Sequence, residues 1–160
     1  MGDPRSSGFQ KWHEEFLFLG KMYTDKTINF GKWYEDFFKT GWFPNQKNPD
    51  ESWVNIHVIT GWWTVYIGNI VDSITEAPEG RILKKFPSGE FVVVTSEWKP
   101  TESQAHESLD EAERRKQMPD GYVDDNSTYI VIEKFYGCPE RGHRWERWYP
   151  IKKAGIGATP

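Results

Sequence analysis

Residues 128–153, TYIVIEKFYGCPERGHRWERWYPIKK, carry the clearest pattern of secondary structure in this chain. Apolar and polar side chains alternate in TYIVIEKFY and again in HRWERWYPIK, and the turn-like GCPERG separates the two runs. Such alternation is typical of strands with one buried face, and glycine and proline are typical of the connections between them. We therefore expect two strands of an antiparallel sheet in this segment.

The first half of the chain shows similar segments in the order strand, helix, strand, strand. A short apolar run at 16–19 ends at Gly20, and aromatic residues then recur at helical spacing from Phe30 to Phe38. After a turn-rich loop, WVNIHVIT and WWTVYIGNIV alternate like strands on either side of Gly61. This half therefore predicts a strand, an amphipathic helix and a β-hairpin.

The second half repeats this order. FVVVTS, entered through the turn PSGE, is typical of a strand, and ESQAHESLDEAERRKQM favours a helix. The polar segment DSITEAPEG at 72–80 joins the two halves. The sequence thus predicts an α+β fold, a duplicated strand-helix-strand-strand unit with a pseudo-twofold axis. Two helices would cover one face of an antiparallel sheet, and a ligand groove would lie on the other.

Domain boundaries follow from the same pattern. We expect a flexible N-terminal arm at 1–10 and a single domain at 11–153, with repeats at about 11–71 and 82–153. The small residues at 154–160 are expected to form a flexible tail. A chain of 160 residues is of ordinary length for one domain.

Charge and composition exclude several classes of function. With 20 basic and 24 acidic residues the net charge is −4, so we expect neither nucleic acid nor a membrane as a direct partner. Cys138 is the single cysteine and the four histidines lack metal-ligand spacing, so we expect no disulfide and no metal site. The sequence has no nucleotide-binding glycine motif, secretion signal or membrane-spanning apolar run, which predicts a cytoplasmic protein without a cofactor.

Aromatic residues are abundant, and one carboxylate lies among them. Nine Trp, seven Tyr and ten Phe make up 16% of the chain, more rings than two helices over one sheet easily cover. Strand alternation places Glu133 on the same face as Tyr129 and Phe135. A carboxylate in such surroundings either pairs with a neighbouring cation, such as Arg147, or is available to a positively charged ligand. The sequence leaves both possibilities open.

We expect the walls of the site to be aromatic side chains in or beside the predicted strands. Such rings stack on planar aromatic ligands and attract cations over their faces. The expected ligand-binding residues are Glu133, Trp53, Trp63, Tyr66, Trp98, Tyr129, Phe135, Trp145 and Tyr149. A shift of one residue in strand phase would move any of these side chains to the opposite face.

Several segments resemble the GyrI-like small-molecule-binding domains, which include the effector-binding domains of bacterial transcription activators. The similar segments are RILKKFPSGEFVVVTSEW, YIVIEKFYG and RWERWYPIKK, together with FLFLGKMYT, GWWTVYIGN and EAPEGR in the first half. The resemblance covers roughly residues 12–153. It implies a duplicated SHS2-type fold and an aromatic groove between the repeats. It also implies an acidic residue on the penultimate strand that meets lipophilic cations, which is Glu133 here.

The resemblance leaves three functions open. The first is the binding of hydrophobic, cationic or planar aromatic small molecules. The second is hydrolysis of strained, cyclopropane-containing electrophiles, with Glu133 as the catalytic residue that positions or activates water. The third is a protein interaction like that of family members that inhibit DNA gyrase. Because no helix-turn-helix segment precedes the domain, we expect no direct contact with nucleic acid. The protein partner that the third function requires would be a transcription regulator or gyrase.

Overall fold

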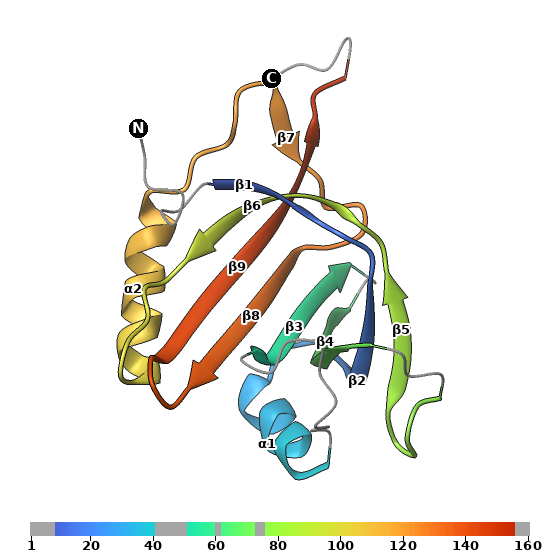
Figure 1. Ribbon diagram of the computed structural model, residues 1–160. Coiled ribbons are helices and arrows are strands. Elements are labelled where there is room, and N and C mark those ends of the chain that lie inside the picture. The colour runs from blue at the N-terminus through green and yellow to red at the C-terminus, as the bar shows by residue number, and fades with distance from the viewer. Residues whose placement is uncertain (1–8, 41–50, 60–61, 73–75, 156–160) are drawn as a thin grey trace.

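The computed structural model describes residues 9–40, 51–59, 62–72 and 76–155. In these residues, a curled nine-stranded sheet packs with two helices (Figure 1). The strands are β1 (Phe9–His13), β2 (Phe16–Asp25), β3 (Glu51–Ile59), β4 (Trp63–Val71), β5 (Ile82–Phe86), β6 (Gly89–Thr95), β7 (Tyr122–Asp124), β8 (Val131–Cys138) and β9 (Gly142–Lys153), and the helices are α1 (Phe30–Thr40) and α2 (Glu102–Arg114). Their strand pairs are antiparallel, which confirms the predicted α+β class.

The strand order has the expected internal symmetry. The strands follow one another as β1-β6-β9-β8-β3-β4-β2-β5, and β7 pairs with β9. Each strand of the first half has its counterpart at the mirrored position, so that β2 corresponds to β6, β3 to β8 and β4 to β9. The pseudo-twofold axis therefore passes between β3 and β8, at the centre of the sheet.

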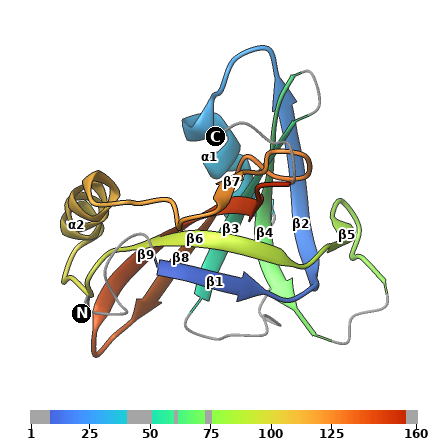
Figure 2. The ribbon, with the colours of Figure 1, turned by 90° about the horizontal axis from the view of Figure 1, so that it is seen from above.

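The outermost strands are exchanged between the two halves. β1 precedes β2 in the chain but pairs with β6, whereas β5 precedes β6 but pairs with β2. The pairing keeps one register around both bends, from Phe9 opposite Val93 to Gly20 opposite Ile82. Residues 9–20 and 82–93 thus form two long bent strands that bring the edges of the sheet together (Figure 2).

The inside of the curled sheet is a packed core. It holds Phe16, Phe18, Val54, Ile56, Tyr66, Ile70, Phe86, Phe91, Val93, Tyr129, Ile132 and Trp148. The fold class is confirmed, but the expectation of a ligand groove on the face without helices is wrong. The two bent strands close that face, and its aromatic side chains are used to fill the space that they enclose.

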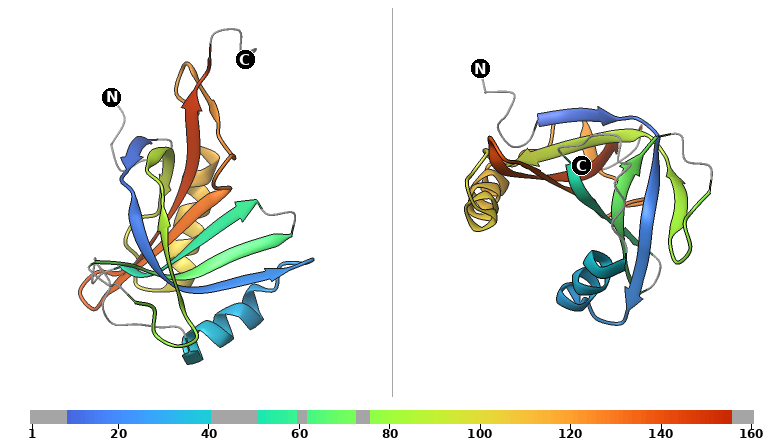
Figure 3. Two further views of the ribbon diagram at one scale, coloured as in Figure 1. Left: turned by 90° about the vertical axis from the view of Figure 1, so that its right-hand side faces the viewer. Right: turned by 60° about the horizontal axis from the view of Figure 1, so that its bottom comes forward.

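Both helices lie on the outer face, on either side of its centre (Figure 3). Trp33 and Phe37 of α1 pack on β4. Leu109 and Ala112 of α2 pack on β6, and Thr101 caps α2 through a capping box. Because β4 and β6 lie away from the axis, the helices leave β3 and β8 uncovered between them. In the described part of the chain, neither helix has the length and apolar character needed to cross a bilayer.

Two strands lie where the sequence predicts other structure. β1 begins at Phe9, within the segment expected to be a flexible arm. β7 lies between the predicted helix and the strand that carries Glu133, where the sequence predicts neither, and its three residues pair with β9 alone. Both strands are too short to show a clear alternation, and their pairing depends on partners that are distant in sequence.

The close approach of β2 and β4 yields a prediction about stability. Gly20 and Gly68 lie opposite each other, and a methyl group on Gly68 would be 2.2 Å from the carbonyl oxygen of Leu19 and 2.8 Å from the Phe18 ring. We predict that Gly68→Ala lowers the free energy of unfolding, measured in urea, by about 1 to 3 kcal/mol. The control Gly31→Ala in α1 meets nothing within 4 Å and should raise it slightly. Equal stability of the two variants would contradict this close packing.

Candidate functional site

A hollow of about 490 Å³ lies over the uncovered centre of the sheet, between α1 and α2. The three strands β3, β8 and β9 form its floor, and each helix forms one wall. Its lining residues are Phe30, Tyr34 and Phe38 from α1, Trp53 and Asn55 from β3, Glu133 and Phe135 from β8, Trp145 and Arg147 from β9, and Glu102 and His106 from α2. The hollow is thus built from both halves of the fold.

Three neighbouring strands contribute rings to the floor. Trp53 lies opposite Phe135 in the sheet, and Phe135 lies opposite Trp145. Trp53 stacks on Phe135 with centroids 5.2 Å apart, and Trp145 meets Phe135 edge-on at 5.0 Å. Phe38 of α1, which is 53% exposed, meets Trp53 edge-on at the rim. This side of the hollow is therefore aromatic, and it suits a guest with rings of its own.

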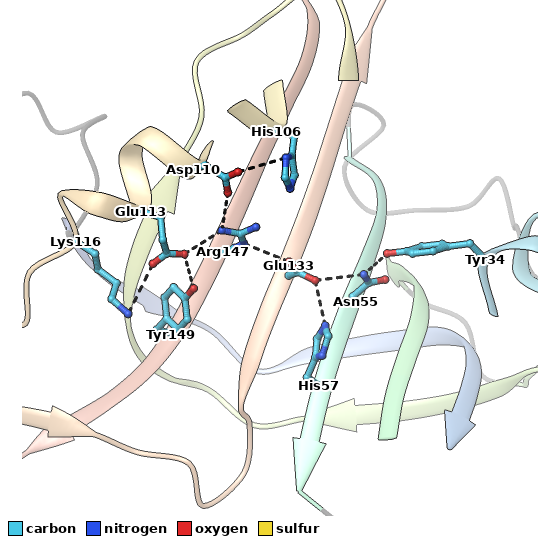
Figure 4. A network of polar contacts seen from close by, with 10 residues as sticks. All are labelled: Tyr34, Asn55, His57, His106, Asp110, Glu113, Lys116, Glu133, Arg147 and Tyr149. Carbon is cyan, nitrogen blue, oxygen red and sulfur yellow. Dashed lines mark hydrogen bonds and ion pairs between the residues drawn. The ribbon is translucent and has the colours of Figure 1, made fainter. Parts of the chain in front are cut away.

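Glu133 is the acidic residue that the floor presents to the hollow. Oε1 is 3.1 Å from Nε2 of His57 and 3.5 Å from the amide nitrogen of Asn55, and Oε2 is 3.4 Å from Nε of Arg147 (Figure 4). Burial by itself raises the pKa of the Glu133 carboxyl. The bond and charge of His57, and then the charge of Arg147, outweigh burial and hold this pKa below its usual value of 4.5. Glu133 is therefore ionised at neutral pH.

Arg147 connects Glu133 to α2. Its Nη1 is 3.0 Å from Oε1 of Glu113 and 3.6 Å from Oδ1 of Asp110 (Figure 4). The hydroxyl of Tyr149 donates to the same Glu113 oxygen at 2.5 Å. One guanidinium on β9 thus bridges the floor of the hollow and the helix that forms its wall.

Asn55 makes the corresponding connection to α1. Its amide nitrogen lies within hydrogen-bonding distance of Glu133 and also donates to the hydroxyl oxygen of Tyr34 (Figure 4). Burial of Tyr34, partly offset by that hydrogen bond, raises the pKa of its hydroxyl to about 12, so the phenol stays neutral. A chain of polar contacts therefore crosses the hollow from one helix to the other.

The network holds three carboxylates, from Asp110, Glu113 and Glu133, and two permanent cations, Arg147 and Lys116. His57 and His106, which carry charge only when protonated, lie beside Glu133 and Asp110. Glu102 adds a further carboxylate to the lining of the hollow. With both imidazoles neutral, negative charge is in excess, which makes the hollow a better environment for a positive ligand than for a negative one.

Four of the predicted binding residues come together here: Glu133, Trp53, Phe135 and Trp145. Tyr66 and Tyr129 do not line the hollow, since both are buried in the core on the opposite face. The predicted alternation places Tyr129 on the same face as Glu133. It fails because Tyr129 lies before the first residue of β8. Its hydroxyl donates to the carbonyl oxygen of Pro87 at 2.7 Å.

The other three predicted residues also lie outside this lining. Trp63 begins β4 and is 48% exposed. Trp98 lies under the guanidinium of Arg141, which is 4.4 Å from the ring centroid. Tyr149 is on the same face as the hollow, but it packs under α2. Their aromatic character identified them, and it did not distinguish rings at the centre of this face from rings elsewhere.

Arg147 is the partner that the sequence already offers for Glu133, and the structure confirms this pair. The other polar partners of Glu133 and the rings of α1 are absent from the predicted site. Alternation along β3 places Asn55 and His57 on the face of Trp53, so their position was accessible to sequence reasoning. Tyr34 and Phe38 could be assigned to the site only once α1 was placed beside the axis. In the described ranges, no cluster of three or more His, Cys, Asp or Glu side chains could hold a metal ion.

The state of Glu133 yields a prediction about acid stability. Because its pKa is lowered in the folded protein, its ionised form stabilises the fold above the usual pKa, and this contribution is lost as the pH falls through the lower folded value. We predict that Glu133→Gln lowers the free energy of unfolding by on the order of 1 to 3 kcal/mol at neutral pH. In urea titrations repeated at about pH 3, the difference in free energy of unfolding between the variant and the wild type should be smaller. A difference that does not change with pH would rule out an ionised, paired Glu133.

No protein-family model matches the sequence, and no curated protein matches it. Solved structures do share its fold. SAV2435 bound to tetraphenylphosphonium has a TM-score of 0.65 at 8% identity, over 89% of this chain and 92% of that one. A putative transcription regulation protein from Staphylococcus aureus has a TM-score of 0.58 at 11% identity, over 89% and 96%. The C-terminal domain of EcmrR has a TM-score of 0.52 at 13% identity, over 90% and 96%.

At these identities the likeness concerns the fold, and it agrees with the motifs in both halves of the sequence. The chain has the fold of the GyrI-like small-molecule-binding domains.

Proposed function

We propose that the protein binds hydrophobic organic cations in the hollow between α1 and α2. The observation that carries this proposal is the ionised Glu133 on an aromatic floor, with a side chain that is only 21% exposed. A cation beside it gains charge attraction in surroundings where water is scarce, and its rings gain contact with Trp53 and Phe135. SAV2435, which shares the fold, is bound to such a cation, tetraphenylphosphonium, and this supports the proposal.

The dimensions of the hollow fit a guest with several rings. A volume of about 490 Å³ lies in the range of sites for drug-sized molecules. A large cation that carries one spread-out charge is only weakly hydrated, so it loses little on entering an aromatic site. The expected guest is therefore a multi-ring monocation, in preference to a small, strongly hydrated ion.

The hydrolase alternative is not favoured by the surroundings of Glu133. A general base works best when its pKa lies near the working pH, whereas the pKa of Glu133 is lowered. His57 and Arg147 contact one carboxylate oxygen each, an arrangement that suits a counter-ion better than a proton acceptor. No contact among the described residues specifically favours a protein interaction with gyrase or a regulator.

Loss of the Glu133 charge tests the proposal. We expect the wild type to bind tetraphenylphosphonium, measured by calorimetry or by quenching of tryptophan fluorescence, and to bind the neutral triphenylphosphine oxide far more weakly. Glu133→Gln should reduce the affinity for the cation by at least about tenfold. Glu140→Gln, which removes the same charge from an exposed turn, is the matched control and should bind like the wild type. Equal affinities for cation and oxide, or for the wild type and Glu133→Gln, would contradict the proposal.

The aromatic floor gives a second prediction. Trp53→Ala should weaken the binding of both tetraphenylphosphonium and the neutral oxide by about tenfold, because both molecules carry phenyl rings that pack on the indole. Trp63→Ala removes an exposed ring outside the hollow and should leave both affinities unchanged. Thermal unfolding of the two variants checks that each is folded. If Trp63→Ala weakened binding and Trp53→Ala did not, the site would lie elsewhere.

A further inference from the structure

Arg147 lies between two sets of carboxylates and is held more closely by one of them. Its Nη1 is 3.0 Å from Glu113 and 3.6 Å from Asp110, both on α2. Its Nε is 3.4 Å from Glu133, a distance at the long end for a hydrogen bond. The contact with the floor of the hollow is therefore weaker than the contact with the helix.

This arrangement bears directly on the cation site. A positive guest that binds Glu133 must compete with the guanidinium already beside that carboxylate. We infer that Arg147 occupies the position of the cationic guest, and that a guest displaces it from Glu133 while Glu113 and Asp110 keep hold of it. The inference rests on the proposed function and adds the residue that controls the affinity and selectivity of the site.

The exchange is feasible because Arg147 does not lose its neutralising partners. A guanidinium has five N–H donors and stays charged in proteins, so a cation without carboxylates nearby would be costly in this half-buried position. Glu113 and Asp110 already lie on the side away from Glu133 (Figure 4). When the guest enters and Nε moves away, the guest lies beside Glu133 and Arg147 stays beside Glu113 and Asp110. Each cation therefore keeps at least one carboxylate as its partner.

The two oxygens of Glu133 have separate roles in this exchange. Oε1 is within reach of His57 and Asn55, whereas Oε2 is the oxygen that faces Arg147. Displacement of Arg147 vacates Oε2 and leaves the two contacts of Oε1 in place. The carboxylate therefore stays oriented while its counter-ion is replaced, and the guest approaches it from the side of α2.

Selectivity follows from the competition. A neutral guest makes no charge interaction with Glu133 and does not displace Arg147, so its affinity does not depend on this residue. A small cation must displace Arg147 without the compensation of ring contacts on Trp53 and Phe135. A multi-ring cation gains both the charge attraction to Glu133 and the ring contacts with Trp53 and Phe135. The need to displace Arg147 therefore favours this class of ligand over small cations.

Charge removal at Arg147 tests the exchange. We expect Arg147→Gln to bind tetraphenylphosphonium about tenfold more tightly than the wild type, and triphenylphosphine oxide with unchanged affinity. Glu113→Gln takes away the alternative partner of Arg147 and should weaken binding of the cation by about threefold. Glu107→Gln, at an exposed position of the same helix, is the matched control and should have a much smaller effect.

The double variant separates this exchange from a general effect of charge. If Glu113 acts by holding the displaced Arg147, Glu113→Gln should have no effect in a protein that already carries Arg147→Gln. If Glu113 acts through its own negative charge on the guest, the loss should persist in the double variant, and the inference would be wrong.

A measurement on the wild type avoids dependence on the folding of any variant. The Nε–H group of Arg147 gives a signal in nitrogen–proton NMR spectra, assigned by its loss in Arg147→Lys. Addition of tetraphenylphosphonium should shift this signal strongly, because Nε leaves Glu133. Triphenylphosphine oxide should not shift it.

The outcomes distinguish the inference from the proposed function. If neither the wild type nor Arg147→Gln binds tetraphenylphosphonium, the proposed function fails and the exchange fails with it. If the wild type binds in a manner that depends on Glu133, while Arg147→Gln binds no more tightly and the Nε–H signal does not move, the proposed function stands and the exchange is wrong.

Discussion

The antiparallel pairing of residues 9–20 with 82–93 is the constraint on which the rest of the structure depends. Because this pairing continues around both bends, the sheet closes over one of its faces and fills the enclosed space with side chains. The helices then pack on the outer face, over β4 and β6. The central strands stay uncovered on that face, and the position of the hollow follows from the closure of the sheet.

The hollow lies on the pseudo-twofold axis, yet its chemistry is not symmetric. Asn55 of β3 and Glu133 of β8 lie directly opposite each other across the axis. The symmetric backbone therefore presents an amide from one half and a carboxylate from the other. Each is linked to the helix of its own half, Asn55 through Tyr34 and Glu133 through Arg147. Because the residues at these two equivalent positions differ, the site carries a negative charge on the side of β8 and a neutral amide on the side of β3.

Much of this could be predicted from the alternation of residues. The order of elements, the strands β8 and β9, and the shared face of Glu133 and Phe135 all follow from local patterns. Alternation shows which side chains share a face, but it does not show which face a helix will cover. Tyr66 and Trp53 are both aromatic residues on strands of the first half. Only the bends between β1 and β2 and between β5 and β6 decide that the first is enclosed while the second meets the hollow.

The exchange of β1 and β5 also has a consequence for how such a fold can arise by duplication. The first strand of each repeat, β1 or β5, pairs with a strand of the other repeat, and so does the central strand, β3 or β8. A repeat taken alone would therefore lack partners for two of its strands. An ancestor with one repeat would have been complete only as a domain-swapped homodimer, with a twofold axis where β3 and β8 now meet. Gene fusion would turn that intermolecular axis into an internal one, and it would free the two copies to evolve different residues there.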